Sequence, residues 1–276
     1  WVRVASQWAG TGDSHCGNLT LPRVGTEVLV AFIGGDPDKP IIISQLYNAR
    51  ALPPPLSKNA NLPTTRFLSG IRSQEIQGWR ANQLRFDDTP REISAQLASD
   101  HAAAELNLGY LTEPRQQGGA RARGEGAELR TQEAIALHAA RGILLSTWKL
   151  LGGAAAKGGQ LARDDYLGLL RECGELCSSL GKYASEHNGL EVDGEEQRAL
   201  LDRFVGWEDG SNTKPKATQP GEPVIAMTSP AGIGFASSKA IISYAGSNLD
   251  GVAQQHLQLT AGQRFSVNAG KGVSLF

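Results

Sequence analysis

Several residue types are scarce in this 276-residue chain. There are three cysteines, Cys16, Cys173 and Cys177, which are too few for a disulfide framework and fit a reducing compartment. Aromatic residues make up 6% of the chain whereas glycine occurs 33 times, a composition that favours a narrow, repetitive β structure over a broad globular core. The formal net charge is −1, so charge gives no reason to expect binding to nucleic acid or to an anionic membrane.

Long apolar runs are also missing. None approaches the length that spans a bilayer and no signal peptide is recognisable, so we expect no stable membrane insertion. The only methionine is Met227 and Phe276 falls inside a repeat. We therefore expect Trp1 not to be a native start and the chain to be a piece of a longer protein.

No complete catalytic or metal-binding motif is present. The sequence contains no H-E-x-x-H, and no dinucleotide-binding or Walker A motif is completed. Cys173 and Cys177 have helical spacing rather than the spacing of a zinc pair. Adjacent carboxylates such as Asp87 and Asp88 point in different directions and are poorly placed for acid–base work. We predict no enzyme activity in this stretch, no catalytic residues, no metal and no cofactor.

An eight-residue repeat runs from Pro223 to Phe276. Two largely apolar columns, two residues apart, recur at this step. Because positions i and i+2 of a strand share a face, each octad predicts a short strand with two inward side chains, followed by a corner. The predicted inward residues are Ile225, Met227, Ile233, Phe235, Ile241, Leu249, Leu257, Leu259, Phe265, Val267, Val273 and Leu275.

Two architectures fit this repeat. One is an antiparallel meander packed on another element, and the other is a three-sided prism to which three identical chains each contribute one strand per octad. Ordering eight residues costs roughly 8 kcal/mol or more, whereas two half-buried side chains return only about 3–6 kcal/mol. A lone sheet with one bare apolar face would be marginal and prone to aggregation. We therefore favour the trimer, with the inward residues as its core.

The repeat is predicted to start earlier and to be interrupted by helices. Ala127, Ile135 and Ile143 also step by eight. A coiled-coil seam then runs from Tyr166 through Cys173, Cys177 and Leu180 to His187, with Asp164 and Asp165 in the first turn and a stop at Gly189. A second helix is predicted to start at Asp193, with Glu196 completing a variant capping box, and to run towards Trp207.

The short link between the two helices predicts an antiparallel hairpin. Since the repeat does not itself require this hairpin, it is a candidate docking surface for a partner; a packed buttress without a partner is the alternative. The candidate docking residues are Tyr166, Leu170, Leu180, Tyr183, Leu200, Phe204 and Trp207.

Residues 1–48 predict the end of a small β domain, with strands Glu27–Ile33 and Ile41–Tyr47 around a turn at 34–40. The runs 1–6, 21–32 and 34–43 resemble the OB-fold of the valine-glycine repeat (VgrG) proteins, the spike proteins of bacterial type VI secretion. Residues 70–73 and 82–89 also resemble this family. The octads depart from the related phage pattern V-x-G, because their first column is mostly Ile, Leu or Phe and their second is mostly apolar.

The resemblance implies a homotrimeric spike that pierces a target envelope. It would cap a tube of Hcp rings, carry a PAAR-type tip protein, and deliver an effector, with or without an adaptor. It would reside in the bacterial cytoplasm before firing and then be delivered without a signal peptide. Two alternatives stay open: a needle that carries a catalytic domain beyond residue 276, and an OB-type module that binds a carbohydrate or nucleic-acid ligand.

The predicted fold is therefore mainly β. It consists of the C-terminal part of an OB-fold followed by an intertwined trimeric β-helix or β-prism, which a helical hairpin interrupts. The predicted domains are an OB-fold collar at 1–48, an extended linker at 49–82, a first needle segment at 83–150, the hairpin with its return loop at 151–222, and the octad needle at 223–276.

Overall fold

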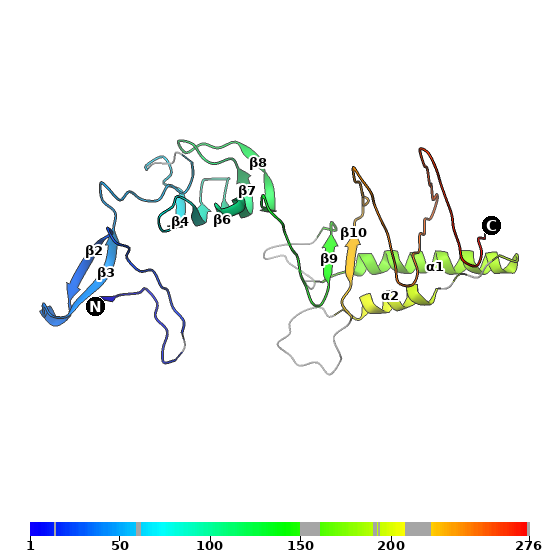
Figure 1. Ribbon diagram of the computed structural model, residues 1–276, viewed down its shortest axis with the longest axis horizontal. Coiled ribbons are helices and arrows are strands. Elements are labelled where there is room, and N and C mark those ends of the chain that lie inside the picture. The colour runs from blue at the N-terminus through cyan, green and yellow to red at the C-terminus, as the bar shows by residue number, and fades with distance from the viewer. Residues whose placement is uncertain are drawn as a thin grey trace. The chain divides into compact units, whose positions relative to one another are not determined.

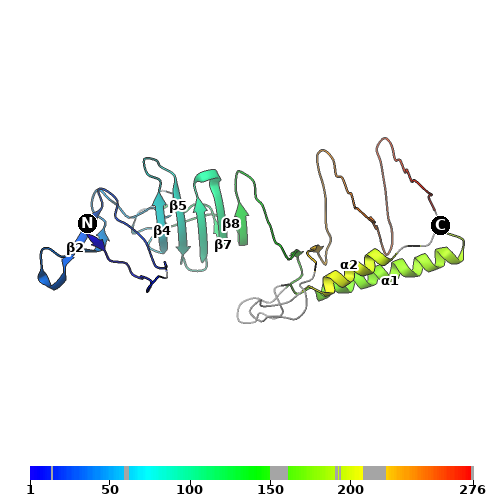
Figure 2. The same cartoon turned by 60° about the horizontal axis from the view of Figure 1, so that its bottom comes forward.

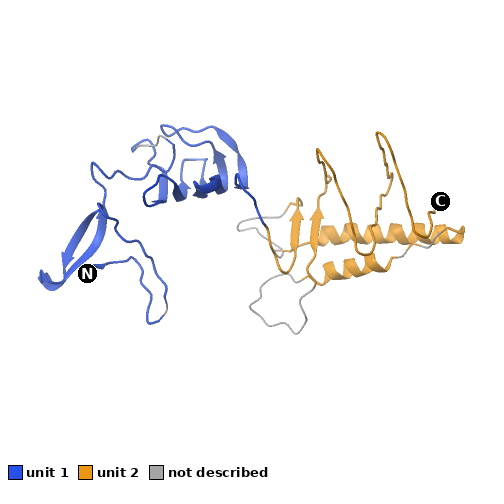
Figure 3. Ribbon diagram, in the orientation of Figure 1, with its two compact units in different colours: residues 1–136 blue, residues 137–276 orange. Residues whose placement is uncertain are grey.

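The computed structural model describes residues 1–13, 15–58, 62–149, 161–189, 192, 194–207 and 222–274. The chain divides into two compact units, Trp1–Ala136 and Leu137–Phe276, which Figure 3 colours separately. The regular structure described in the first unit consists of strands and two short 3-10 helices, and the second unit carries two α-helices and a pair of short strands. The mainly β fold with a helical interruption is confirmed.

The first unit opens with a three-stranded sheet in the order β1-β3-β2. Strand β1 (Arg3–Val4) runs parallel to β3 (Pro40–Leu46), and β2 (Glu27–Phe32) runs antiparallel to β3. The predicted pair of strands is confirmed, each ending one residue early. Strand β2 stops before Ile33 because the short 3-10 helix η1 (Ile33–Gly35) begins there. Within η1, Gly34 adopts the left-handed conformation at φ 65°.

Five antiparallel strands follow as a meander (Figure 2). They are β4 (Leu68–Gln74), β5 (Ala81–Asp87), β6 (Ser94–Ser99), β7 (Ala104–Thr112) and β8 (Ala122–Arg130), with η2 (His101–Ala103) between β6 and β7. Strand β4 lies inside the range 49–82 that the sequence predicts as a linker, because Gly70 weakens its apolar alternation. Each strand is paired with the next one in antiparallel order, so β5 to β8 form hairpins rather than octad windings.

A buried ion pair fastens the loop after β7 to the end of β5. Arg115 Nε donates to Asp87 Oδ2 at 2.6 Å, and the two side chains are almost completely buried. The Thr89 N–H and hydroxyl both donate to Asp87 Oδ1, and the Arg115 guanidinium also pairs with Glu92 at 2.7 Å. Burial alone lowers the pKa of Arg115, but the bonds to Asp87 and Glu92 outweigh it, so the net pKa is raised. Asp87 is therefore a structural carboxylate.

The second unit contains the parallel pair β9 (Ile143–Ser146) and β10 (Ile225–Thr228). Between them in sequence come α1 (Asp164–Glu186) and α2 (Glu195–Val205) (Figure 1). The Tyr166 ring meets the Phe204 ring edge-on at 4.9 Å, and Gln197 contacts Cys177 further along α1. The start of α1 thus lies against the end of α2, and the predicted antiparallel hairpin is confirmed.

The helix ends differ from the prediction in two details. Helix α1 ends at Glu186 because Asn188 adopts the left-handed conformation at φ 64°, and the Gly189 N–H turns back to the Ala184 carbonyl at 2.7 Å. The predicted capping box of α2 is wrong: its N-cap is Gly194, which has no side chain to cap with. Asp193 lies outside the described residues.

The predicted seam of α1 is wrong at Leu180. The side chain of Leu180 is exposed, whereas Gly181 is buried. A Cβ atom on Gly181 would come within 2.9 Å of the Val192 Cβ, so Val192 lies over the glycine. A periodicity that counts apolar side chains cannot find this position, because the contact depends on the absence of a side chain.

Candidate assembly surface

The pairing of β9 and β10 brings the octad columns on the two sides of the helical interruption into register. Ile143 is paired with Ile225, and Leu145 with Met227. These residues belong to the same two columns of the repeat, and they share one face of the strand pair because alternate residues of a strand point the same way. The interruption thus returns the chain to the phase it had at β9.

The opposite face of the strand pair is covered by the helices. Ala226 is fully buried in a cluster with Leu167, Phe204 and Trp207, and Leu144 packs against the same cluster. The Trp148 indole N–H donates to the Thr228 hydroxyl at 3.0 Å and ties together the ends of the two strands. The hairpin and the strand pair therefore share one hydrophobic core.

Arg163 secures the end of α2 within this core. Its guanidinium donates to the backbone carbonyls of Phe204, Val205 and Trp207, and also to that of Leu161. The last carbonyls of a helix have no partners within the helix, and a cation there also suits the helix dipole. The side chain is only 9% exposed, so these bonds are largely shielded from water.

Gly142 allows the chain to enter β9 under Trp207. Its φ is +120°, and a Cβ atom there would lie 2.6 Å from the Trp207 ring and 2.6 Å from the Val224 carbonyl oxygen. Any larger residue would both strain the backbone and push Trp207 off the strand pair.

The face that carries the octad columns has no cover among the residues that the structure describes. Ile225 and Met227 are exposed on β10, and the inward residues predicted from Ile233 to Val273 are exposed too, all eleven between 42% and 73%. Leu275, the twelfth predicted inward residue, lies outside the described residues. From residue 229 to 274 the described chain forms no strand pairing, and Figure 1 draws it as an extended trace.

A second uncovered apolar surface lies on the meander of the first unit. One large residue from each strand forms a row across the sheet: Ile71, Leu84, Leu97, Leu106 and Leu129. All five side chains are exposed, and Phe86 and Leu108 extend the same surface. This row was not predicted, because Ile71 and Leu129 lie far apart in sequence and only the strand register brings them together.

The structure separates the predicted docking residues into two groups. Phe204 and Trp207 are buried in the core of the second unit, and Tyr166 and Leu170 are half-buried against it. Leu180, Tyr183 and Leu200 are exposed on the hairpin. Only this second group is available to a partner in the conformation described.

Neither a metal centre nor a membrane helix is found in the part of the chain that the structure describes. No three His, Cys, Asp or Glu side chains there gather closely enough to hold an ion. No helix there is long and apolar enough to cross a bilayer.

A three-stranded sheet, a five-stranded meander and a repeat region with exposed apolar columns define a mainly β repeat protein. Family profiles agree along the chain. Residues 1–47 match "Type VI secretion system/phage-baseplate injector OB domain", and residues 74–184 match "Putative type VI secretion system Rhs element Vgr". Residues 212–276 match a profile described as an uncharacterized protein conserved in bacteria.

Two relatives in Pseudomonas aeruginosa match over the whole chain. The type VI secretion system spike proteins VgrG2b and VgrG2a are each 43% identical to it over 276 residues. The chain spans 26% and 31% of their respective lengths. A shorter match of 88 residues, at 42% identity, is to the spike protein VgrG3 of Vibrio cholerae and covers 32% of this chain and 8% of VgrG3.

Solved structures agree with these matches. A VgrG spike from the type VI secretion system superposes with a TM-score of 0.62 at 28% identity, covering 76% of this chain and 71% of that one. A VgrG spike bound to the effector Tle1 superposes with the same TM-score at 27% identity, covering 76% of this chain and 58% of that one. The chain belongs to the VgrG family of type VI secretion spike proteins.

Proposed function

We propose that three copies of this chain wind together into the shaft of a secretion spike. One observation carries the proposal: the octad columns of residues 225–274 are bare in the single chain, although their phase is kept across an interruption of roughly eighty residues. Covering one such side chain gains about 1.5–3 kcal/mol. Three chains that supply one another's walls would gain this at every octad and would leave no strand edge unpaired.

A shaft of this kind suits mechanical work. Continuous backbone pairing around a dry core of Ile, Leu and Phe resists bending and local opening, because every strand is held on both edges. In this proposal the trimer caps an Hcp tube, carries a PAAR-type tip, and is driven through a target envelope after residing in the bacterial cytoplasm. The relatives in Pseudomonas aeruginosa, which are spike proteins of the type VI secretion system, support this setting.

Effector carriage is the second part of the proposal. A related spike structure is described as bound to the effector Tle1. In this chain the hairpin offers exposed apolar residues, Leu180, Tyr183 and Leu200, at which an effector or adaptor could dock. Catalysis would then belong to the cargo and not to residues 1–276.

Light scattering coupled to size-exclusion chromatography tests the shaft. The expected mass is three times the 29.3 kDa of the chain. A folded species with the mass of one chain, at concentrations of tens of micromolar, would contradict the proposal.

One observation favours a second function, the carriage of a catalytic domain joined to the shaft. A Vibrio cholerae relative that is 41% identical over 88 residues is named "Actin cross-linking toxin VgrG1", and this chain covers only 7% of it. The sequence of the gene beyond the codon for Phe276 tests this alternative. An open reading frame that encodes a further folded domain would support it, and a stop codon shortly after the octads would exclude it.

A further inference from the structure

The meander has a polar face opposite its apolar row, and side-chain amides link its strands. Gln83 donates to Gln96 at 2.8 Å, Gln96 to Asn107 at 3.0 Å, and Asn107 to Glu128 at 3.0 Å. These bonds fix the side chains of four strands without help from solvent, so groups placed among them are held in defined positions.

A hollow of about 190 Å³ opens on this face, and three arginines and one glutamate are among its lining residues. Two of these arginines are neutralised. Arg123 forms a two-pronged contact with Glu128, at 2.6 Å and 3.0 Å, and Arg130 contacts Glu105 at 2.9 Å. Arg85 is the third arginine, and it forms no ion pair with a carboxylate among the described residues, although Asp87 and Glu105 lie near enough to act on its charge.

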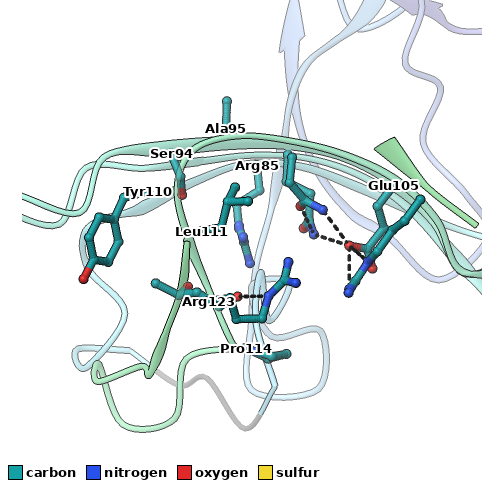
Figure 4. Close-up of a pocket in the computed structure, with 12 residues that line it drawn as sticks. Arg85, Ser94, Ala95, Glu105, Tyr110, Leu111, Pro114 and Arg123 are labelled. Atoms are coloured by element: carbon teal, nitrogen blue, oxygen red, sulfur yellow. Dashed lines mark hydrogen bonds and ion pairs between the residues drawn. The ribbon is translucent and has the colours of Figure 1, made fainter. Parts of the chain in front are cut away.

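Arg85 is half-buried, and its contacts leave most of its hydrogen-bonding capacity unused. It donates from one terminal nitrogen to the Leu56 carbonyl at 3.3 Å, whereas its buried Nε has no partner among the described residues. Burial lowers the pKa of Arg85, and the nearby negative charges of Asp87 and Glu105 offset this only in part. Figure 4 shows the Arg85 and Arg123 side chains extending into the same hollow, with Ser94 beside them.

We propose that this hollow, the Arg85 site, binds a single oxyanion, either the carboxylate of an acidic side chain on a partner or a free phosphate. A guanidinium presents parallel N–H groups that match two oxygens of one such anion. The two terminal nitrogens of Arg85, one of which makes only a 3.3 Å contact to the Leu56 carbonyl, supply this fork. The volume accommodates a carboxylate or a phosphate together with water, since a water molecule occupies roughly 30 Å³ in the liquid.

Two titrations of the full 276-residue protein test the site. Inorganic phosphate is followed by the width of its ³¹P resonance, and N-acetylglutamate by saturation transfer from the protein to its methyl group. Saturable binding of phosphate alone would assign the site to free phosphate, and saturable binding of N-acetylglutamate would assign it to acidic side chains. The absence of saturation with both probes would overturn the proposal.

The variant Arg85→Gln is expected to lower the affinity for the bound probe by about tenfold or more, since it removes the charged guanidinium fork. Arg80→Gln is the matched control, because Arg80 immediately precedes the strand that carries Arg85 but is already paired with Glu75 at 2.8 Å; it should leave binding unchanged. Arg85→Lys, which keeps the charge without the fork, should bind with intermediate strength and guards against a folding defect in the glutamine variant. Equal binding by the Arg85→Gln protein and the wild type would also refute the site. The mass of the assembly is not expected to change in any variant, so this test is independent of the trimer.

Discussion

Two arginines show what single residues do in this molecule. Arg163 and Arg115 are both buried, and each gives its guanidinium to partners far away in sequence: Arg163 to the end of α2 and Arg115 to Asp87 at the end of β5. A buried guanidinium is stable only when its N–H groups are satisfied. Each of these side chains therefore fixes the position of a whole segment.

The first prediction concerns Arg163. Arg163→Ala would leave the last carbonyls of α2 buried without donors, and hydrogen bonds to a charged group are worth about 1.5–3 kcal/mol. We expect the free energy of unfolding of the second unit to fall by about 3 kcal/mol. Urea denaturation followed by the circular dichroism of the two helices measures this, and Arg171→Ala, at an exposed position on α1, should change it little. Equal loss in the two variants would contradict the capping role.

The second prediction concerns pH and the turn between β4 and β5. Hydrogen bonds from the Arg80 side chain, and then from its backbone, lower the pKa of Glu75 from 4.5 to about 2. Because the pKa is depressed, the contribution of Glu75 to stability is present above pH 4.5 and is lost as the pH falls through about 2.

A ¹³C NMR titration of the Glu75 carboxyl group measures this pKa directly. The midpoint should lie near 2 in the wild type and move up towards 4.5 in Arg80→Gln. Arg72→Gln, in the neighbouring strand and paired with Asp100, should leave the midpoint in place. A wild-type midpoint near 4.5 would show that the Glu75–Arg80 contact does not form in solution.

Residues of this kind could not be predicted from the sequence. Nothing in the local pattern around Arg163 or Asp87 distinguishes them from solvated charges, because their partners lie 41 and 28 residues away. The same holds for Gly181, whose role appears only once Val192 is placed over it.

At the scale of elements, the local sequence pattern was sufficient to predict strands and helices wherever the apolar periodicity was strong. The strand pair β2 and β3 follows from two β-rich runs around a Gly/Asp/Pro turn, and helices α1 and α2 follow from their apolar stripes. Strand β4 was missed because Gly70 and polar residues hide its alternation. The pairing of β9 with β10 could not be predicted either, although both strands belong to the same repeat, because roughly eighty residues separate them.

The third prediction concerns the hairpin as an element. It covers Ala226 and Leu144 on one face of the strand pair, while the octad columns occupy the other face. Deleting Gly158–Gly206 leaves roughly thirty residues to connect β9 with β10, more than the dozen or so that a parallel crossover needs. We expect assembly to persist, with a lower melting temperature, and light scattering to give three times the shortened chain mass. Loss of assembly would show that the hairpin is part of the shaft.

At the scale of the whole molecule, the proposed assembly rests on the amount of apolar surface that the described residues leave exposed. Residues 225–274 and the row on the meander expose large apolar side chains that a soluble single chain would not normally display. The octad repeat predicted the first surface from sequence alone. The second required the strand register, and neither surface is covered by other described residues.

The fourth prediction separates the inward columns from the outward positions. In the proposed trimer, Leu257→Asp would place a charge in the shared core three times, at several kcal/mol per buried charge. The neighbouring Gln258→Asp introduces the same charge at an outward position. We expect the first variant to dissociate or aggregate and the second to keep the wild-type mass, as measured by sedimentation velocity. If both variants keep the wild-type mass, the columns do not face a core.

Hydrogen exchange of the amides from residue 229 to 274 tests the central claim most directly. Within one chain this segment has no strand partner among the described residues, so unprotected amides would exchange at the rate of an unfolded peptide. If neighbouring copies pair its strands, the amides should be protected by a factor of at least about 10³, and the protection should disappear when the protein is diluted below its assembly concentration. Protection that persists in a species of single-chain mass, or exchange at the unfolded rate in the assembled protein, would contradict the account.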